Sequence, residues 1–312
     1  MVAVGREDLW LPVGNVIGPL PAGQPNDGSV RVTGIDRSTD GGLTWSFTGL
    51  PGCLQECGNM PSLSFLDALQ GFAAIGPDHG GTQLFFTGDG GVTWVPVAGI
   101  PTADGARIEF TSPVDGWAVG TYAFAGGSGD AGRLYRTSDG GLTWSPAPGL
   151  PSNEAFQIPT FFNSNEGVLL GRDDSISMTS ESLPLVYDTE DGGTNWTAHR
   201  IPAVTKVDVT AFYDRTENAA SVPFDAVSPA DWKLYVGPDL YGTTNAGHTW
   251  VKVVPTPMSA AGSIGSIAFS SSTDGIAMVQ KPGCAVASGG GCYPVLIDTT
   301  DGGRHWLPQM LP

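Results

Sequence analysis

The segment Thr137–Trp144 reads TSDGGLTW, and five further segments of the chain repeat nearly the same eight letters. Each copy follows the pattern Ser/Thr-x-Asp-x-Gly-x-x-Trp, except that one copy has Asn in place of Asp. We call these segments boxes; the other five are Ser38–Trp45, Thr87–Trp94, Thr189–Trp196, Thr243–Trp250 and Thr299–Trp306. Successive box tryptophans are 49 to 56 residues apart, a period that predicts a stack of similar supersecondary units.

The residues between two boxes read as a four-stranded antiparallel meander. Residues 107–110 and 117–120 are short apolar stretches on either side of a turn that contains Pro and Gly. Residues 133–136 form a third predicted strand, and residues 143–145 open a fourth after the box turn. Four strands repeated radially predict an all-β, six-bladed β-propeller with no exchanged closing strand. We expect one domain over residues 1–312, with blades at roughly 1–50, 51–101, 102–151, 152–202, 203–257 and 258–312.

Each box has the composition of a hairpin turn closed by a hydrophobic residue. An Asp or Asn at the start of a turn accepts hydrogen bonds from backbone N–H groups a few residues on, and the glycines supply positive φ angles. We therefore expect structural roles for the box acids and for the tryptophans that follow them. The turn with Asn245 and Ala246 should survive in weakened form. The predicted structural residues are Asp40, Asp89, Asp139, Asp191, Asn245, Asp301, Trp45, Trp94, Trp144, Trp196, Trp250 and Trp306.

The boxes resemble the Asp-box, or BNR, repeats of sialidases, sortilin-type receptors and some glycanases. The longer pattern, Asp-Gly-Trp-Ala-Val-Gly at 115–120 followed by the box at 137–144, is closer to photosystem II assembly-factor-like proteins. In these families the boxes lie away from the active site, so the resemblance implies no catalytic role for the box acids. The assembly-factor group is associated with a basic patch. Since this chain has only 14 Lys and Arg residues, a photosynthetic role does not follow.

The meander topology predicts two ends for every blade. The boxes and the turns between first and second strands share one end, which we call the box end. The loops between second and third strands, and between blades, share the other end, which we call the loop end. Variable segments fall at the loop end, so we expect a ligand or partner there. Its candidate binding aromatics are Tyr122, Phe124, Phe156, Tyr213, Tyr241 and Tyr293.

Catalysis would need groups that the boxes do not supply. The sialidase signature Arg-Ile-Pro occurs at 200–202, but it follows the fourth box, where other blades carry Gly-Leu-Pro or Gly-Ile-Pro. Glycoside hydrolysis needs two suitably spaced carboxylates, and a hydrolytic triad needs Ser or Cys beside an Asp–His pair. The loop-end catalytic candidates are Asp78, His79, Asp104, Asp173 and Asp174. We expect no cofactor, with Ca²⁺ at Asp173 and Asp174, or at Asp130, as the alternative.

Charge and cysteine content restrict the partner and the compartment. The net charge of −17 opposes binding to nucleic acids or anionic membranes, and no apolar run is long enough to cross a bilayer. The spacings of Cys53/Cys57 and Cys284/Cys292 do not match a zinc site. They favour two local disulfides in an oxidising compartment, with reduced thiols as the alternative. Residues 1–8 lack the basic and apolar segments of a signal peptide, so we expect an extracytoplasmic protein whose signal sequence is absent from this chain.

These observations favour a non-catalytic, extracytoplasmic scaffold that binds a protein or glycan partner at the loop end. The alternative is a glycan-active hydrolase that uses loop-end carboxylates. We expect the protein to be a monomer.

Overall fold

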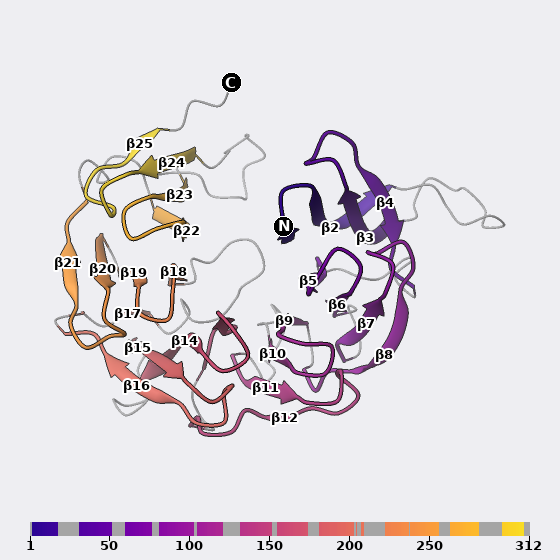
Figure 1. The fold of residues 1–312 in the computed structure, drawn as a ribbon, viewed down its shortest axis with the longest axis horizontal. Coiled ribbons are helices and arrows are strands. Elements are labelled where there is room, and N and C mark those ends of the chain that lie inside the picture. Colours follow the sequence, from indigo (N-terminus) through magenta and orange to yellow (C-terminus); the bar gives the residue numbers. More distant parts are fainter. Residues whose placement is uncertain are drawn as a thin grey trace. The chain divides into compact units, whose positions relative to one another are not determined.

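The computed structural model (Figure 1) describes most of the chain and divides it into two compact units, Met1–Ala147 and Pro148–Pro312. Unit 1 is the first of these and unit 2 the second. The described residues are 2–17, 31–51, 60–76, 81–102, 105–120, 132–151, 155–173, 181–202, 204, 207–208, 222–236, 238–255, 263–280 and 295–308.

Unit 1 contains three antiparallel sheets, each formed by four strands in sequence order. The first sheet consists of β1 (Val2–Val4), β2 (Asp8–Ile17), β3 (Arg31–Ser38) and β4 (Ser46–Gly49). The second consists of β5 (Ser62–Phe65), β6 (Gly71–Ile75), β7 (Gln83–Thr87) and β8 (Val95–Gly99). The third consists of β9 (Ala106–Phe110), β10 (Gly116–Gly120), β11 (Leu134–Thr137) and β12 (Ser145–Pro146).

Unit 2 contains three sheets with the same strand order. The fourth sheet consists of β13 (Thr160–Phe161), β14 (Gly167–Asp173), β15 (Glu181–Thr189) and β16 (Thr197–Arg200), and β17 (Val207–Asp208) pairs with β15. The fifth consists of β18 (Phe224–Ala226), β19 (Trp232–Val236), β20 (Asp239–Thr243) and β21 (Val251–Val253). The sixth consists of β22 (Ser263–Phe269), β23 (Gly275–Gln280), β24 (Val295–Thr299) and β25 (Leu307–Pro308).

The fold class is the six-bladed β-propeller, as the box repeat predicted, and the described residues form strands, turns and loops without a helix. β1 pairs with β2 and β25 pairs with β24, so the described terminal strands stay in their own sheets as predicted. The fourth strand of the third sheet begins at Ser145 rather than residue 143, because the box turn extends through Trp144. The described residues contain no helix long and apolar enough to cross a membrane.

In four of the six sheets, a phenylalanine at the end of the first strand packs over a glycine at the start of the second strand. Phe110 at the end of β9 pairs with Gly116, and a Cβ atom at Gly116 would lie 2.6 Å from that ring. The second, fourth and sixth sheets repeat this pair. In the fifth sheet the sizes are exchanged, since Ala226 pairs with Trp232. In each of these five sheets one aromatic ring lies beside a small residue, as close packing requires.

Neighbouring blades of unit 1 interlock through stacked aromatic rings. The ring of Trp10 on β2 stacks on Phe65 of the second sheet, with centroids 3.8 Å apart. Phe72 on β6 stacks in the same way on Phe110 of the third sheet, at 3.6 Å. In unit 2 a cation takes this place between the fifth and sixth sheets, where the Lys233 ammonium lies 5.7 Å from the ring of Phe269. Dispersion and cation–π contacts thus join successive blades within each unit.

The second glycine of a box also contacts the blade before it. A Cβ atom at Gly141 would lie 2.2 Å from Leu84 of the second sheet, and one at Gly303 would lie 2.4 Å from Leu240 of the fifth. The Trp10 indole N–H donates to the carbonyl of Gly90, at 2.8 Å, in the next box. The boxes therefore hold blades together as well as closing hairpins.

Candidate functional site

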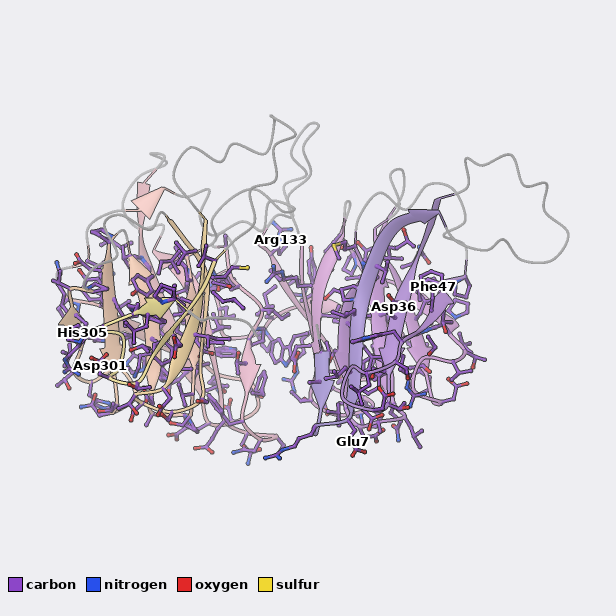
Figure 2. The ribbon with its side chains drawn as sticks, turned by 90° about the horizontal axis from the view of Figure 1, so that it is seen from above. Glu7, Asp36, Phe47, Arg133, Asp301 and His305 are labelled. Carbon is purple, nitrogen blue, oxygen red and sulfur yellow. The ribbon has the colours of Figure 1, made fainter. Side chains whose placement is uncertain are left out.

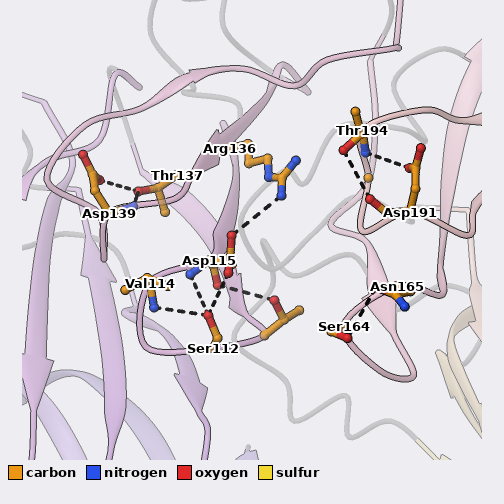
Figure 3. Close-up of polar contacts among 12 residues, drawn as sticks. Ser112, Val114, Asp115, Arg136, Thr137, Asp139, Ser164, Asn165, Asp191 and Thr194 are labelled. Carbon is orange, nitrogen blue, oxygen red and sulfur yellow. Dashed lines mark hydrogen bonds and ion pairs between the residues drawn. The ribbon is translucent and has the colours of Figure 1, made fainter.

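The box at Thr137–Trp144 shows a pattern of hydrogen bonds that recurs in the other boxes, with a different side chain four residues after the Asp in some of them. Figure 3 draws the bond between Thr137 and Asp139. The Asp139 carboxylate accepts from the backbone N–H of Thr143 at 2.9 Å, from the Thr143 hydroxyl at 2.6 Å and from the Thr137 hydroxyl at 2.8 Å. The Thr137 hydroxyl also accepts from the N–H of Gly141 at 2.9 Å. The Gly140 N–H donates to the carbonyl of Val114 at 2.9 Å, which ties the box to the turn between β9 and β10.

These bonds hold the box acids in the ionised form. Hydrogen bonds from the Thr143 side chain and backbone, then from Thr137, lower the pKa of Asp139 to about 2. Equivalent bonds, with the side chain four residues on as the largest cause, lower the pKa values of Asp40, Asp89 and Asp191 to about 2. A carboxylate that is saturated with donors and ionised at neutral pH can neither donate a proton nor accept one readily.

The fifth box keeps the turn with an amide in place of the carboxylate. Asn245 Oδ1 accepts from the Thr249 N–H at 2.9 Å, and its Nδ2 donates to the Thr249 hydroxyl at 2.9 Å. Ala246 has a φ of 52° and is the one described non-glycine residue with a positive φ. The left-handed conformation is strained for a residue with a Cβ atom.

The box tryptophans differ in burial. Trp94 and Trp306 are buried, whereas Trp45 is 39% exposed, and the other three are intermediate. In four boxes the indole N–H donates to the second glycine carbonyl of the same box, as in Trp144 to Gly141 at 3.1 Å. The turn is thus constant, while the packing of its tryptophan depends on the neighbouring blade.

The predicted loop-end candidates are only partly represented among the described residues. Asp173 ends β14, where its backbone pairs with Leu183. Phe156 and Tyr241 are 3% and 4% exposed, so both side chains are buried in this structure. Phe156 packs against Tyr187 with ring centroids 5.7 Å apart. The remaining candidates lie outside the described residues: Asp78, His79, Asp104, Asp130, Asp174, Tyr122, Phe124, Tyr213, Tyr293, Cys53, Cys57, Cys284 and Cys292.

Two first-strand carboxyl groups that the sequence reading missed have raised pKa values. Glu109 lies on β9 opposite Trp117, and burial raises its pKa to about 7. Asp225 lies at the matching position of β18, and burial raises its pKa although it accepts a 2.6 Å hydrogen bond from the N–H of Phe269. At this position of β5, Ser64 accepts from the N–H of Phe110 at 2.8 Å. Aligning the first strands by register would have identified this polar position.

The box end of unit 1 carries exposed aliphatic side chains at two repeated positions. The first position is the residue directly after the two box glycines. The second position lies in the turn between the first and second strands, and its carbonyl accepts a hydrogen bond from the N–H of the first box glycine. The side chains are from 50% to 85% exposed. We call them the unit 1 apolar row: Leu43, Leu69, Val92, Val114 and Leu142.

The same two positions are mostly polar in unit 2. The residues that follow the glycines there are Thr194, His248 and Arg304, and the turn residues are Asn165, Ala230 and Thr273. The backbone hydrogen bond between turn and box is nonetheless kept in all six blades, at 2.7 to 3.0 Å. The fold therefore does not require aliphatic residues at these positions.

The boxes and turns that carry the apolar row also carry carboxylates. The three boxes of unit 1 and the turns at 5–7, 66–70 and 111–115 contain six acidic residues, and their one basic residue is Arg6. Figure 2 shows Glu7 at this end of unit 1 and Arg133, which precedes β11, at the opposite end. Arg37 and Arg136, on β3 and β11, lie 3.7 Å from the carboxylates of Asp8 and Asp115. The box end of unit 1 is thus an acidic surface with aliphatic contacts.

The fold places the chain among β-propellers, and solved structures of that class align with most of it. One is titled "YCF48 bound to D1 peptide", with TM-score 0.53 and 16% identity over 90% of this chain and 78% of that one. YCF48 from Cyanidioschyzon merolae aligns with TM-score 0.54 and 15% identity, over 96% and 88%. A GH74 xyloglucanase from Xanthomonas campestris aligns with TM-score 0.57 and 14% identity, over 96% of this chain and 45% of its own length.

No family model matches the sequence, and no curated protein matches it. At identities of 14% to 16% the similarity concerns the fold alone.

Proposed function

We propose that this protein is a non-catalytic scaffold that binds a protein partner. The unit 1 apolar row is the observation that carries the proposal. Aliphatic side chains that are at least half exposed recur on three blades, at positions that unit 2 fills with mainly polar residues. Exposed apolar side chains that recur at one end of successive blades favour an interaction site there.

The box chemistry supports the same proposal. The box acids are committed to hydrogen bonds that close the turns and stay ionised, so they suit a rigid framework better than proton transfer. The structurally similar YCF48 is described as bound to a peptide, which is compatible with peptide recognition on this fold.

Chemical cross-linking of the purified chain in an extract of its source cells tests the proposal. We expect one discrete protein adduct, identified by mass spectrometry, and no retention on a glycan array. Retention on the array without any protein adduct would refute a protein partner.

A glycan-active hydrolase is the second candidate, because Glu109 has the pKa expected of a general acid. Such an acid must be protonated near neutral pH, and burial raises the Glu109 pKa to about 7. Among the first strands of unit 1, β1, β5 and β9, Glu109 is the one carboxylate, so a second acid would have to come from other residues. Turnover of chromogenic glycosides that is abolished in Glu109→Gln would establish this alternative, and its absence favours the scaffold.

An extracytoplasmic location and two local disulfides are part of the proposal. Their support is the spacing of Cys53/Cys57 and Cys284/Cys292 in the sequence. Titration of free thiols in the denatured protein tests them. We expect thiols to become detectable only after reduction, and four thiols without reduction would contradict the pairing.

A further inference from the structure

We infer that the unit 1 apolar row docks a basic, amphipathic segment of a partner protein. This inference rests on the proposed function and adds the place and chemistry of the contact. Its two elements are the exposed aliphatic side chains of the row and the carboxylates of the same boxes and turns.

The repeats provide an internal control for the aliphatic element. Gly90 donates to the carbonyl of Leu69 in unit 1, and Gly302 makes the same bond to Thr273 in unit 2. Since threonine serves the turn equally well, the leucine is not needed to form it. The same comparison holds between Leu142 and Arg304, which both follow a box Gly-Gly pair. The turn and the box therefore do not determine that these exposed positions are aliphatic.

The backbone holds the row in a fixed arrangement. Leu69 and Val92 belong to segments joined by the 2.7 Å bond from Gly90 to the Leu69 carbonyl. Val114 and Leu142 are joined in the same way by the 2.9 Å bond from Gly140. A preformed apolar surface reduces the ordering cost of association.

The charges determine which partner fits. Six acidic residues and one arginine lie in the turns and boxes of unit 1. Arg136 pairs with one of these acids, Asp115, and Arg37 donates to the carbonyl of Asp89, so the acids still outnumber the cations. Hydrogen bonds keep Asp40, Asp89 and Asp139 ionised, so the negative charge persists well below neutral pH. A segment with Lys or Arg on one side and aliphatic residues on the other complements both elements, and opposite charge also accelerates association.

Other occupants match the surface less well. A second copy of the chain would bring another net charge of −17 to an acidic surface. Anionic lipid headgroups and nucleic acid would be repelled by the same carboxylates. The proposal therefore commits to a cationic protein segment.

A fluorescently labelled peptide of about 20 Leu and Lys residues, long enough to form an amphipathic helix, is a suitable probe. We expect saturable binding by fluorescence anisotropy that weakens with added salt, and no binding of the same peptide with Glu in place of Lys. The variant Leu69→Ser/Val92→Ser/Leu142→Ser should bind at least about tenfold more weakly, since three apolar contacts are lost. The matched control is Val251→Ser/Val254→Ser, which removes two exposed valines of unit 2 and should bind as the wild type does.

Equal binding by the triple variant would refute the inference, because the attraction would then be charge alone. If the triple variant unfolds, the single substitutions Leu69→Ser and Val92→Ser give the same comparison. Sedimentation of a wild-type dimer that the triple variant lacks would assign the row to a second copy, and tighter binding to anionic vesicles than to the peptide would assign it to lipid. Each of these results overturns the inference.

The cross-linking experiment separates this inference from the proposed function. A partner adduct that persists in the triple variant would keep the function and refute the docking site. The absence of any adduct with the wild-type chain would refute the function itself.

Discussion

Replacing Glu109 with Gln should remove a pH-dependent loss of stability. Burial raises the Glu109 pKa from its ordinary 4.5 to about 7 in the folded protein. A raised carboxyl pKa means that the unfolded chain loses this proton at lower pH than the folded chain does. The stabilising contribution is therefore complete below about pH 4.5 and is lost as the pH rises to about 7.

The size of the effect follows from the shift. A difference of roughly 2.5 units, at 1.36 kcal/mol for each unit, corresponds to about 3 kcal/mol. By linkage, roughly 60% of this is lost by about pH 6, and nearly all of it by about pH 8. Gln cannot ionise, so its contribution does not change over this range.

Urea-induced unfolding of wild type and Glu109→Gln, followed by tryptophan fluorescence from about pH 5 to about pH 8, measures the difference. Comparing the two proteins cancels the titration of all other groups. We expect the variant to gain stability relative to wild type by about 2–3 kcal/mol over this range. A difference that stays constant with pH would show that Glu109 is solvated and would refute the reasoning.

Three further predictions concern the boxes and the blade core. Ala246→Gly should stabilise the protein by about 0.5–1 kcal/mol in thermal or urea unfolding, because it relieves a positive φ at some cost in chain entropy; a loss of stability would contradict the strain. The Asp139 carboxyl should titrate near pH 2 when followed by ¹³C NMR. It should titrate at higher pH in Thr143→Val, which removes the hydrogen bond that lowers the Asp139 pKa most, and an unchanged midpoint would count against that hydrogen bond. Gly116→Ala should cost about 1–3 kcal/mol by overpacking a stacked phenylalanine ring, while the control Gly81→Ala, with its nearest atom 3.7 Å away, should be tolerated. Equal effects of the two substitutions would refute the packing argument.

The sequence was sufficient for the box turns because their bonds are local. Asp139 contacts residues no more than four positions away, so the eight-letter pattern contains the whole turn. The same locality explains why Asn245 could be recognised as an equivalent. Repetition of the turn then predicted six blades.

Contacts between blades could not be read from the sequence. Gly141 is restricted by Leu84, which lies on the previous sheet, and Asp225 bonds the backbone of Phe269 on the next one. The burial of Glu109 likewise depends on neighbours that are distant in sequence. Phe156 was proposed as a ligand contact because it is aromatic and near a variable segment, but it packs in the core.

The sequence predicted a partner at the loop end, where the variable segments lie, and not at the box end that carries the candidate interface. Its signal was present in the sequence, since the residues that follow the box glycines are Leu43, Val92 and Leu142 in unit 1 and polar in unit 2. This difference between the two units does not change the turn. The exposure of the aliphatic side chains is what makes the difference informative.

Methyl NMR of the leucine and valine side chains during titration with the Leu/Lys peptide tests protein binding at the box end most directly. We expect shift changes concentrated at Leu43, Leu69, Val92, Val114 and Leu142, with Val251 and Val254 of unit 2 unchanged. Equal changes in both groups, or changes confined to unit 2, would contradict it.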